Sequence, residues 1–201
     1  MRQTLASVDP RLATIILAAG GSRRLGQPKQ LLRFRGTPLI VRTARLARQT
    51  VKGEIIVVLG EQQQRLRSLL HRHDQKLVIA NNPHWKQGLA TSLQAGLQQV
   101  PPVASAVLIL LVDQAKLSTA DVVRLIACWQ KRPGKPAAAF FLGRAGAPAV
   151  IPRRWFSDIR ALEGDIGARQ LLRRLGAISL VGLPAAEFDV DTPADATALR
   201  P

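Results

Sequence analysis

The chain lacks the features that mark secreted and membrane proteins. Its 201 residues include one cysteine, Cys128, which excludes an intrachain disulfide framework. The longest apolar stretch, residues 106–112, is far shorter than the roughly 20 residues that a helix needs to cross a bilayer. Residues 1–11 contain no apolar run of the length found in signal peptides. These absences predict a cytoplasmic protein with no membrane partner.

Acidic and aromatic residues are also scarce. The chain has 13 Asp and Glu residues and 29 Lys and Arg residues, which gives a formal net charge of +16. Aromatic residues make up 4% of the chain. A charge of this size raises the local concentration of anions, phosphorylated small molecules among them. Nucleic-acid binding is disfavoured, because most bases are single arginines in helical patterns, without basic blocks or interleaved aromatics: Arg42, Arg45, Arg48, Arg65, Arg67 and Arg124.

Hydrophobic residues, in contrast, make up 47% of the chain, enough for a folded domain with a sizeable core. Four apolar runs, at residues 13–17, 54–59, 76–80 and 106–112, are typical of strands buried on both faces. Helical patterns lie at 37–49, with Thr37 as N-cap and Pro38 in the first helical position, and at 61–71, 88–99 and 119–130. This alternation predicts an α/β fold with a mostly parallel sheet.

The pattern changes after residue 131. We expect a turn at 132–136, a strand at 137–142, a Gly/Ala/Pro loop at 143–148, short helices near 153–161 and 167–175, and a last strand near 178–181. Because neither an internal repeat nor a low-complexity linker divides the chain, residues 1–201 are expected to form one domain.

Ligands of such sheets bind beyond the carboxyl ends of the strands, and residues 17–29 follow the first of them. Small residues there let backbone N–H groups approach a phosphate, and Arg24 and Lys29 supply positive charge. The segment is not a G-x-x-x-x-G-K-[ST] loop, because Gln30 follows Lys29, and not G-x-G-x-x-G, because Gly20 and Gly21 are adjacent. From glycine count alone, an ordinary turn with surface bases is an equal alternative.

Residues 82–93 follow the third run. Asn82 and Pro83 favour a turn, and Gly88 leads into a helix whose exposed N-terminal N–H groups could face a ligand. The alternative is structural: Trp85 packs in the core, and Ser92 lies in a helix without a role.

Two further places carry acids. Asp113 directly follows the run 106–112, where its oxygens would suit Mg²⁺ bound to phosphates, unless it merely caps the next turn. Four acids also gather between Glu187 and Asp195. Thr192 can cap a short helix beginning at Pro193, which would explain Asp195 without any chemistry.

The string L-A-A-G-x-S-x-R-x-G-x-x-K-x-L-L, from Leu17 to Leu32, resembles the nucleotide-binding signature of the MobA-like nucleotidyltransferases. It is most similar to their molybdenum cofactor cytidylyltransferase branch, because Ala19 stands where the guanylyltransferase branch usually has a second glycine. Residues 82–93 resemble the family's N-P-x-W-x-x-G-x-x-x-S-L segment, and residues 189–193 its D-x-D-T-P motif. Asp113 resembles the aspartate of its D-x-P metal motif, with Ala115 in place of the proline.

The resemblance implies a Rossmann-like three-layer α/β/α fold and nucleotidyl transfer with release of pyrophosphate. It implies that Lys29, Arg24 and Asp113 are catalytic, and that Asp113 and Asp191 hold Mg²⁺, with Asp189 as a neighbour. Stretches at 143–148 and 162–169 are similar to the family's acceptor side, where Arg169 could receive a phosphate; alternatively, residues 163–167 are only a turn that joins two helices. The full binding set that it implies is Leu17, Ala18, Ala19, Gly20, Gly21, Ser22, Arg24, Lys29, Gly88, Ser92 and Arg169.

The implied substrates are CTP and an anionic phosphorylated acceptor, molybdopterin, and the implied partner enzyme is a molybdenum hydroxylase. Two alternatives stay open. A nucleotidyltransferase of the same fold would instead accept a sugar phosphate or a polyol phosphate such as methylerythritol phosphate. A non-catalytic chaperone would bind the molybdenum cofactor and deliver it to the hydroxylase, without needing Mg²⁺ or consuming triphosphate.

Overall fold

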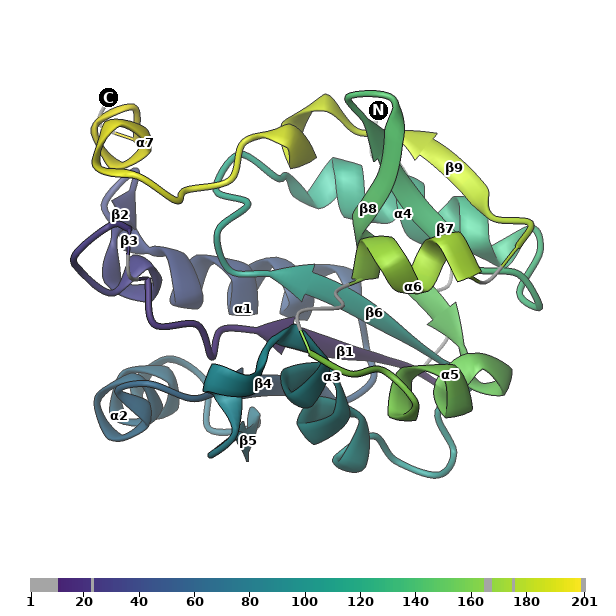
Figure 1. The fold of residues 1–201 in the computed structure, drawn as a ribbon, viewed down its shortest axis with the longest axis horizontal. Helices are drawn as coiled ribbons and strands as arrows, with labels where there is room; N and C mark the ends of the chain where they lie inside the picture. Colours follow the sequence, from purple (N-terminus) through teal and green to yellow (C-terminus); the bar gives the residue numbers. More distant parts are fainter. Residues whose placement is uncertain (1–10, 23, 165–167, 175, 200–201) are drawn as a thin grey trace.

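A seven-stranded sheet forms the middle of the molecule (Figure 1). The computed structural model describes residues 11–22, 24–164, 168–174 and 176–199. The strand order is β5-β4-β1-β6-β8-β7-β9, and among these described strands β8 alone runs antiparallel to its neighbours. The mostly parallel sheet is therefore confirmed. Its strands are β1 (Leu12–Leu17), β4 (Ile55–Leu59), β5 (Val78–Asn81), β6 (Ala106–Leu111), β7 (Ala137–Phe141), β8 (Arg144–Pro152) and β9 (Ser179–Gly182).

Helices cover both faces of the sheet, because its central strands are apolar on both sides. In β1, Leu12 and Ile16 belong to one buried apolar cluster, and Ile15 and Leu17 to the other. The first cluster is completed by α1 (Leu39–Thr50), α2 (Gln63–His73) and α4 (Thr119–Gln130). The second is completed by α3 (Leu89–Gln98), α5 (Phe156–Arg160) and α6 (Ala168–Arg174). This is the expected three-layer α/β/α arrangement.

The strand order changes direction at β1. The chain passes from β1 to β4 and β5 on one side, then crosses over and adds β6 on the other side of β1 (Figure 1). In open sheets of this kind, a change of strand order leaves a crevice at the carboxyl ends of the strands beside it, which here are β1 and β6.

The first expected helix begins one residue later than predicted, at Leu39 in place of Pro38. Thr37 and Pro38 form β3 (Thr37–Pro38), which pairs with β2 (Arg33–Phe34), and the helix starts at Leu39. The prediction that Thr37 is the N-cap was wrong. Arg35 and Gly36 both have positive φ, 50° and 78°, as the two central residues of a tight hairpin turn require.

The expected loop at 143–148 is also wrong, because most of it belongs to β8. Leu142 and Gly143, with φ of 50° and 70°, make a two-residue turn that returns β7 directly into β8. The small residues have a packing reason: a Cβ on Gly146 would lie 3.1 Å from the Phe141 ring. The small residues that suggest a loop therefore belong to a strand, where Gly146 leaves space for the Phe141 ring.

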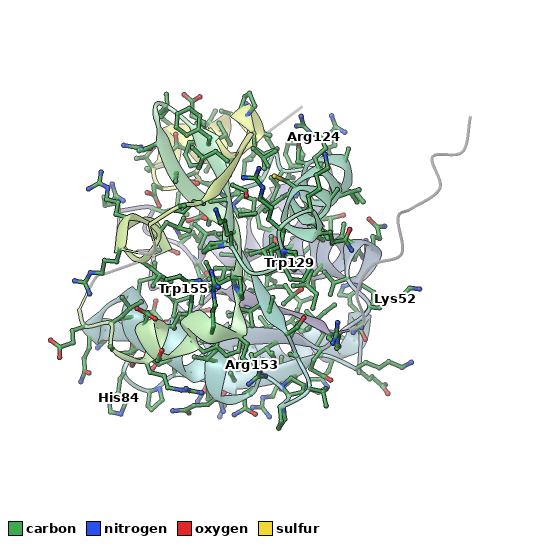
Figure 2. All side chains as sticks on the ribbon, turned by 90° about the vertical axis from the view of Figure 1, so that its right-hand side faces the viewer. Lys52, His84, Arg124, Trp129, Arg153 and Trp155 are labelled. Atoms are coloured by element: carbon green, nitrogen blue, oxygen red, sulfur yellow. The ribbon has the colours of Figure 1, made fainter. Side chains whose placement is uncertain are left out.

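The remaining elements lie close to their predicted bounds, and α4 matches them. Short helical turns complete the chain: η1 (Lys29–Leu31), η2 (Trp85–Gln87), η3 (Arg153–Trp155), η4 (Pro184–Glu187) and α7 (Pro193–Thr197). In the side-chain view, Lys52 and Arg124 lie at the periphery, whereas Trp129 is buried (Figure 2). Within the described ranges, no helix combines the length and apolar character that crossing a bilayer demands.

Candidate active site

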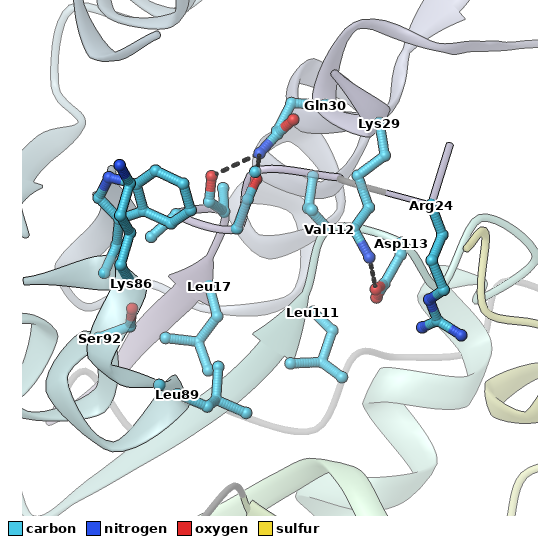
Figure 3. A pocket seen from close by; sticks show the side chains of 16 residues that line it. Leu17, Arg24, Lys29, Gln30, Lys86, Leu89, Ser92, Leu111, Val112 and Asp113 are labelled. Carbon is cyan, nitrogen blue, oxygen red and sulfur yellow. Dashed lines mark hydrogen bonds and ion pairs between the residues drawn. The ribbon is translucent and has the colours of Figure 1, made fainter. Parts of the chain in front are cut away.

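A cleft of about 520 Å³ lies where β1 and β6 end, at the change of strand order (Figure 3). It brings together most residues that the sequence singled out. Those lining it are Leu17, Ala18, Ala19, Gly20, Gly21, Arg24, Lys29, Gly88, Ser92 and Asp113. Ser22 and Asp191 instead line an adjoining hollow of about 200 Å³, which shares Arg24 and Lys29 with the cleft. Phosphate-binding and metal-binding candidates therefore lie side by side.

The loop after β1 presents a row of backbone donors. Its entry is fixed, because the Ala18 N–H donates to Val58 in β4 and the Glu61 N–H donates to the Ala19 carbonyl at 3.3 Å. The N–H groups of residues 19–22 donate to no acceptor in the described part of the chain. Successive unpaired N–H groups in a loop form an anion-binding concavity. This arrangement is the one that a phosphate chain needs.

Gln30 and Trp85 border this loop, and neither was predicted from the sequence to belong to the site. The buried Gln30 amide donates to the carbonyls of Ala18 and Gly20, both at 2.8 Å (Figure 3). Trp85 is half-buried and lines the cleft, and a Cβ on Gly21 would lie 2.7 Å from its ring. Gly21 is thus required by close approach of the indole ring. Trp85 both lines the cleft and packs against the second apolar cluster, so the structural alternative holds in part.

Lys29 connects the two candidate metal ligands. Its Nζ lies 2.6 Å from Asp113 Oδ2 and 2.9 Å from Asp191 Oδ1, and the Lys29 and Asp113 side chains are each 15% exposed. Arg24 adds an ion pair of 2.8 Å to the other oxygen of Asp191. The sequence prediction that these four residues cluster is matched by the geometry.

These contacts shift two pKa values in opposite directions. Burial lowers the pKa of Lys29, but the charges and hydrogen bonds of Asp113 and Asp191 outweigh it, so the pKa lies above its usual value. For Asp191, burial raises the pKa. The hydrogen bond and charge of Lys29 and the charge of Arg24 outweigh this effect, so the pKa of Asp191 lies below its usual value. The Lys29 ammonium and the Asp191 carboxylate are consequently both charged at neutral pH.

Hydrogen bonds involving the backbone position the charged residues. The Ser22 hydroxyl accepts from the Lys29 N–H at 3.0 Å, and Ser22 has a φ of 50°, which turns the loop back toward η1. The Asp113 carbonyl accepts from the N–H groups of Ala115 at 2.8 Å and Val190 at 3.2 Å. Because a proline has no N–H, Ala115 holds this turn by a bond that the family's usual proline lacks.

Gln114 and a capped helix fix the segment that carries Asp191. The buried Gln114 amide donates to Ala147 in β8 and to Ala186 in η4, both at 2.9 Å. Thr192 and Asp195 form a capping box at the start of α7, as predicted from the sequence. Asp195 therefore has a structural role, which leaves Asp191 as the acid that faces Lys29.

The other end of the cleft is more apolar. Leu17, Leu89 and Leu111 lie at its floor (Figure 3). Gly88 has a φ of 114° and precedes α3, a backbone conformation that favours glycine. The Ser92 hydroxyl accepts from the Asn82 amide at 2.9 Å, which leaves its own proton available for an acceptor in the cleft.

One expectation at this end is limited by the structure. Exposed N–H groups were expected at the start of α3, and one of these, the Ala90 N–H, instead donates to the Gly164 carbonyl at 3.2 Å. The chain after α5 therefore caps α3. Arg169 lies on α6 within the described backbone, but its side chain lies outside what is described, as do residues 165–167 of the predicted acceptor stretch.

The charged cluster fits a divalent cation. Asp113 Oδ1 is buried without a hydrogen-bond partner among the described residues, although its other oxygen contacts Lys29. A buried, unpaired carboxylate oxygen is costly unless a cation or donor joins it. Within the described ranges no group of three or more His, Cys, Asp and Glu residues gathers, so ligand oxygens would have to complete the coordination that Asp113 and Asp191 begin.

Residues 14–178 match the family model described as the MobA-like NTP transferase domain. Nicotine blue oxidoreductase of Paenarthrobacter nicotinovorans is 31% identical over 174 aligned positions, which cover 82% of this chain and 83% of that protein. A probable molybdenum cofactor guanylyltransferase of Synechococcus elongatus is 30% identical, with 94% and 97% covered. The molybdenum cofactor cytidylyltransferase of Escherichia coli is 28% identical, with 90% and 91% covered.

Solved structures agree with the architecture. A homologue of Mycobacterium tuberculosis Rv0371c, from Mycobacterium sp. strain JC1, has a TM-score of 0.80 and 30% identity, with 94% of this chain and 95% of that chain covered. Rv0371c from Mycobacterium tuberculosis in complex with manganese has a TM-score of 0.75 and 26% identity, with 94% and 97% covered. By the extent of the family match and these similarities, the chain belongs to the MobA-like NTP transferase family and is a nucleotidyltransferase.

Proposed function

We propose that this protein is a Mg²⁺-dependent cytidylyltransferase that transfers CMP from CTP to the terminal phosphate of molybdopterin in molybdenum cofactor. The observation that carries the proposal is the position of Lys29. Its ammonium contacts both Asp113 and Asp191, and Lys29 lines the same cleft as residues 19–21, whose N–H groups have no acceptor among the described residues. A donor row beside paired acids matches the needs of a triphosphate and its cation. The proposal takes residues 1–201 as one domain, supported by two apolar clusters that share one sheet.

In this reaction an oxygen of the acceptor phosphate attacks the α-phosphorus of CTP, and the bond from that phosphorus to pyrophosphate breaks. Phosphoryl-type transfer depends on alignment and charge neutralisation more than on covalent help from the protein. The loop N–H groups bind the phosphate chain, and Lys29 and Arg24 neutralise the charge that develops on pyrophosphate. Asp113 and Asp191 would hold Mg²⁺, which supplies Lewis-acid stabilisation of the phosphate oxygens when bound.

Ala19 and the apolar floor support cytidine as the base. Ala19 is buried and lines the cleft, at the position where the guanylyltransferase branch usually has a second glycine. Ser92 offers a hydroxyl proton to a carbonyl acceptor such as the cytosine O2. The relatives include both a protein named guanylyltransferase and one named cytidylyltransferase, so the base is tested by direct binding measurements.

A thermal-shift panel tests the nucleotide. The protein is heated with CTP, GTP, ATP or UTP, each with and without Mg²⁺. A ligand at a hundredfold excess over its dissociation constant stabilises the folded state by about 2.7 kcal/mol. We expect a Mg²⁺-dependent shift with CTP that exceeds the others. A preference for GTP would assign the base to guanine. If none of the four nucleotides raises the melting temperature, the chaperone alternative is favoured.

The acceptor is tested next with CTP and Mg²⁺ present. Pyrophosphate release is measured with molybdenum cofactor and, in parallel, with methylerythritol phosphate and a sugar phosphate. Release with molybdenum cofactor alone supports the proposal, whereas release with a polyol or sugar phosphate alone contradicts it. A molybdenum hydroxylase that receives the product remains a proposed partner, to be tested by activation of the apo-hydroxylase.

A further inference from the structure

Gln30 is an uncharged side chain held beside a strongly charged cleft. It is 2% exposed, and its Nε2 donates to the carbonyls of Ala18 and Gly20 at 2.8 Å each. Figure 3 shows both bonds reaching the loop from the Gln30 side. One buried amide therefore fixes two peptide groups of a loop whose donors face a ligand site.

The geometry of the trans peptide gives these bonds a consequence. In each peptide unit the C=O and the following N–H point in opposite directions. Holding the Ala18 carbonyl therefore fixes the direction of the Ala19 N–H, and holding the Gly20 carbonyl fixes that of the Gly21 N–H. The intervening unit is fixed by Glu61, whose N–H donates to the Ala19 carbonyl. Three successive donors are thereby directed away from the groups that hold their carbonyls.

We infer that Gln30 is a positioning residue, which aims the N–H groups of Ala19 and Gly21 at the phosphate chain of the nucleotide. The inference rests on the proposed function, because it needs this loop to bind a polyphosphate. Preorganised donors cost no rearrangement when the ligand binds, so their loss weakens phosphate binding specifically. The nucleoside end of the cleft, near Gly88 and Ser92, makes no contact with Gln30 and should be unaffected.

The test replaces the donor while keeping the shape. Gln30→Glu places a carboxylate against two carbonyls, and Gln30→Met removes the donor without adding charge and covers the case in which the first variant folds poorly. Gln94→Glu is the matched control, because the Gln94 amide also donates to two carbonyls, those of Arg160 and Leu162 at 2.9 Å, and Gln94 does not line the cleft. Gln30→Glu is expected to lose more thermal stability than Gln94→Glu, because Gln30 is 2% exposed and Gln94 is half-buried.

Affinities for inorganic pyrophosphate with Mg²⁺ and for cytidine are then measured by calorimetry and by amide NMR titration. For both Gln30 variants we expect about a tenfold or greater loss of pyrophosphate affinity, with cytidine affinity within about twofold of wild type. The amide resonances of residues 19 and 21, which shift with pyrophosphate in the wild type, should respond less. Gln94→Glu should bind both probes as the wild type does.

The outcomes separate this inference from the proposed function. If the Gln30 variants bind pyrophosphate like the wild type, the positioning role is wrong and the proposed function stands. An equal loss for pyrophosphate and cytidine would also overturn it, because that is the result of general unfolding of the cleft. If the wild type binds neither pyrophosphate nor any nucleotide, both the inference and the proposed function fail.

Discussion

At the scale of single residues, Lys29 has contacts that serve two purposes. With both carboxylates as partners, the ammonium reduces the repulsion between Asp113 and Asp191. The same ammonium lies at the edge of the loop that would bind phosphates. In the proposed nucleotide complex, Asp113 and Asp191 would hold the cation, and the Lys29 ammonium would neutralise phosphate oxygens.

Replacing Lys29 or Asp113 should therefore remove activity without unfolding the protein. For Lys29→Ala and Asp113→Ala we expect turnover to fall by about two to three orders of magnitude, the loss that follows removal of one charge-stabilising group. Lys52→Ala is the control, because Lys52 is exposed and does not line the cleft. Steady-state kinetics measures the effect and circular dichroism checks the fold. Near wild-type turnover in either variant would remove that residue from the proposed mechanism.

The sequence predicted the charged residues better than the neutral ones. Lys29, Asp113 and Asp191 follow strands or a recognisable motif, so their meeting at one sheet edge was predictable. The role of Gln30 was not predictable, because its acceptors are two backbone carbonyls whose positions depend on the folded loop. Trp85 was missed for a related reason: its lining of the cleft depends on Gly21 and Gly60 leaving space for the ring.

At the scale of elements, α3 lies unusually close to the sheet. Its contact is made through Gly96, where a Cβ would lie 2.6 Å from Ile15 Cγ2 in β1 and 3.0 Å from Val58 Cγ2 in β4. Gly96→Ala should destabilise the protein by about 1–3 kcal/mol through overpacking, although alanine is the better helix former. Gly134→Ala, whose Cβ would meet only Arg154 at 3.6 Å, should be nearly neutral. Urea unfolding measures both, and a stabilised Gly96→Ala would contradict the close packing.

The start of α4 should respond to pH. Burial raises the pKa of Asp121, but hydrogen bonds from Ser118 and Arg124 outweigh it, and the pKa lies below its usual value. A folded-state pKa below the unfolded one means that the carboxylate stabilises the fold above about pH 4 and that this contribution is lost as pH falls through the folded-state pKa. Asp121→Asn should thus cost about 1 kcal/mol or less near pH 6, and progressively less below pH 4.

Urea unfolding between pH 3 and pH 7 checks this sign, with Asp158→Asn as the control. Asp158 accepts a long hydrogen bond of 3.4 Å from its neighbour Ser157, so its replacement should change stability little. A constant difference between the wild type and Asp121→Asn across the pH range would contradict the assigned role of the carboxylate.

Element prediction succeeded where hydrophobicity decides and failed where turns decide. The buried strands β1, β4 and β6 were evident as continuous apolar runs. Both hairpins were missed, because their turns place the non-glycine residues Arg35 and Leu142 at positive φ, which composition does not announce. Small residues in β8 then looked like a loop, although they accommodate Phe141.

At the scale of the whole molecule, the net charge of +16 should act on encounter with substrate. Attraction between unlike charges speeds association and is screened within about 10 Å at 0.1 M salt. We expect kcat/KM for CTP to fall as potassium chloride rises from 50 to 300 mM, while kcat changes little. Stopped-flow association and steady-state kinetics at several salt concentrations measure this. A kcat/KM that does not depend on salt would show that the arginine-rich surface has no part in capture.

The architecture followed from the alternation of runs, but the topological detail did not. A parallel sheet and its binding edge were predictable from strands separated by helices. The antiparallel insertion of β8 was not, because its pairing with β6 joins segments that no local pattern connects.

The origin of the two facing carboxylates also has a consequence for biosynthesis. Asp113 follows β6 in the middle of the chain, whereas Asp191 lies near its C-terminal end. The segment that carries Asp191 is held by a hydrogen bond from the Val190 N–H to the Asp113 carbonyl. A ribosome releases the nucleotide loop and the β1, β4, β5 and β6 strands well before that segment. A chain broken off before residue 191 consequently carries the nucleotide loop and the first acid but never the second.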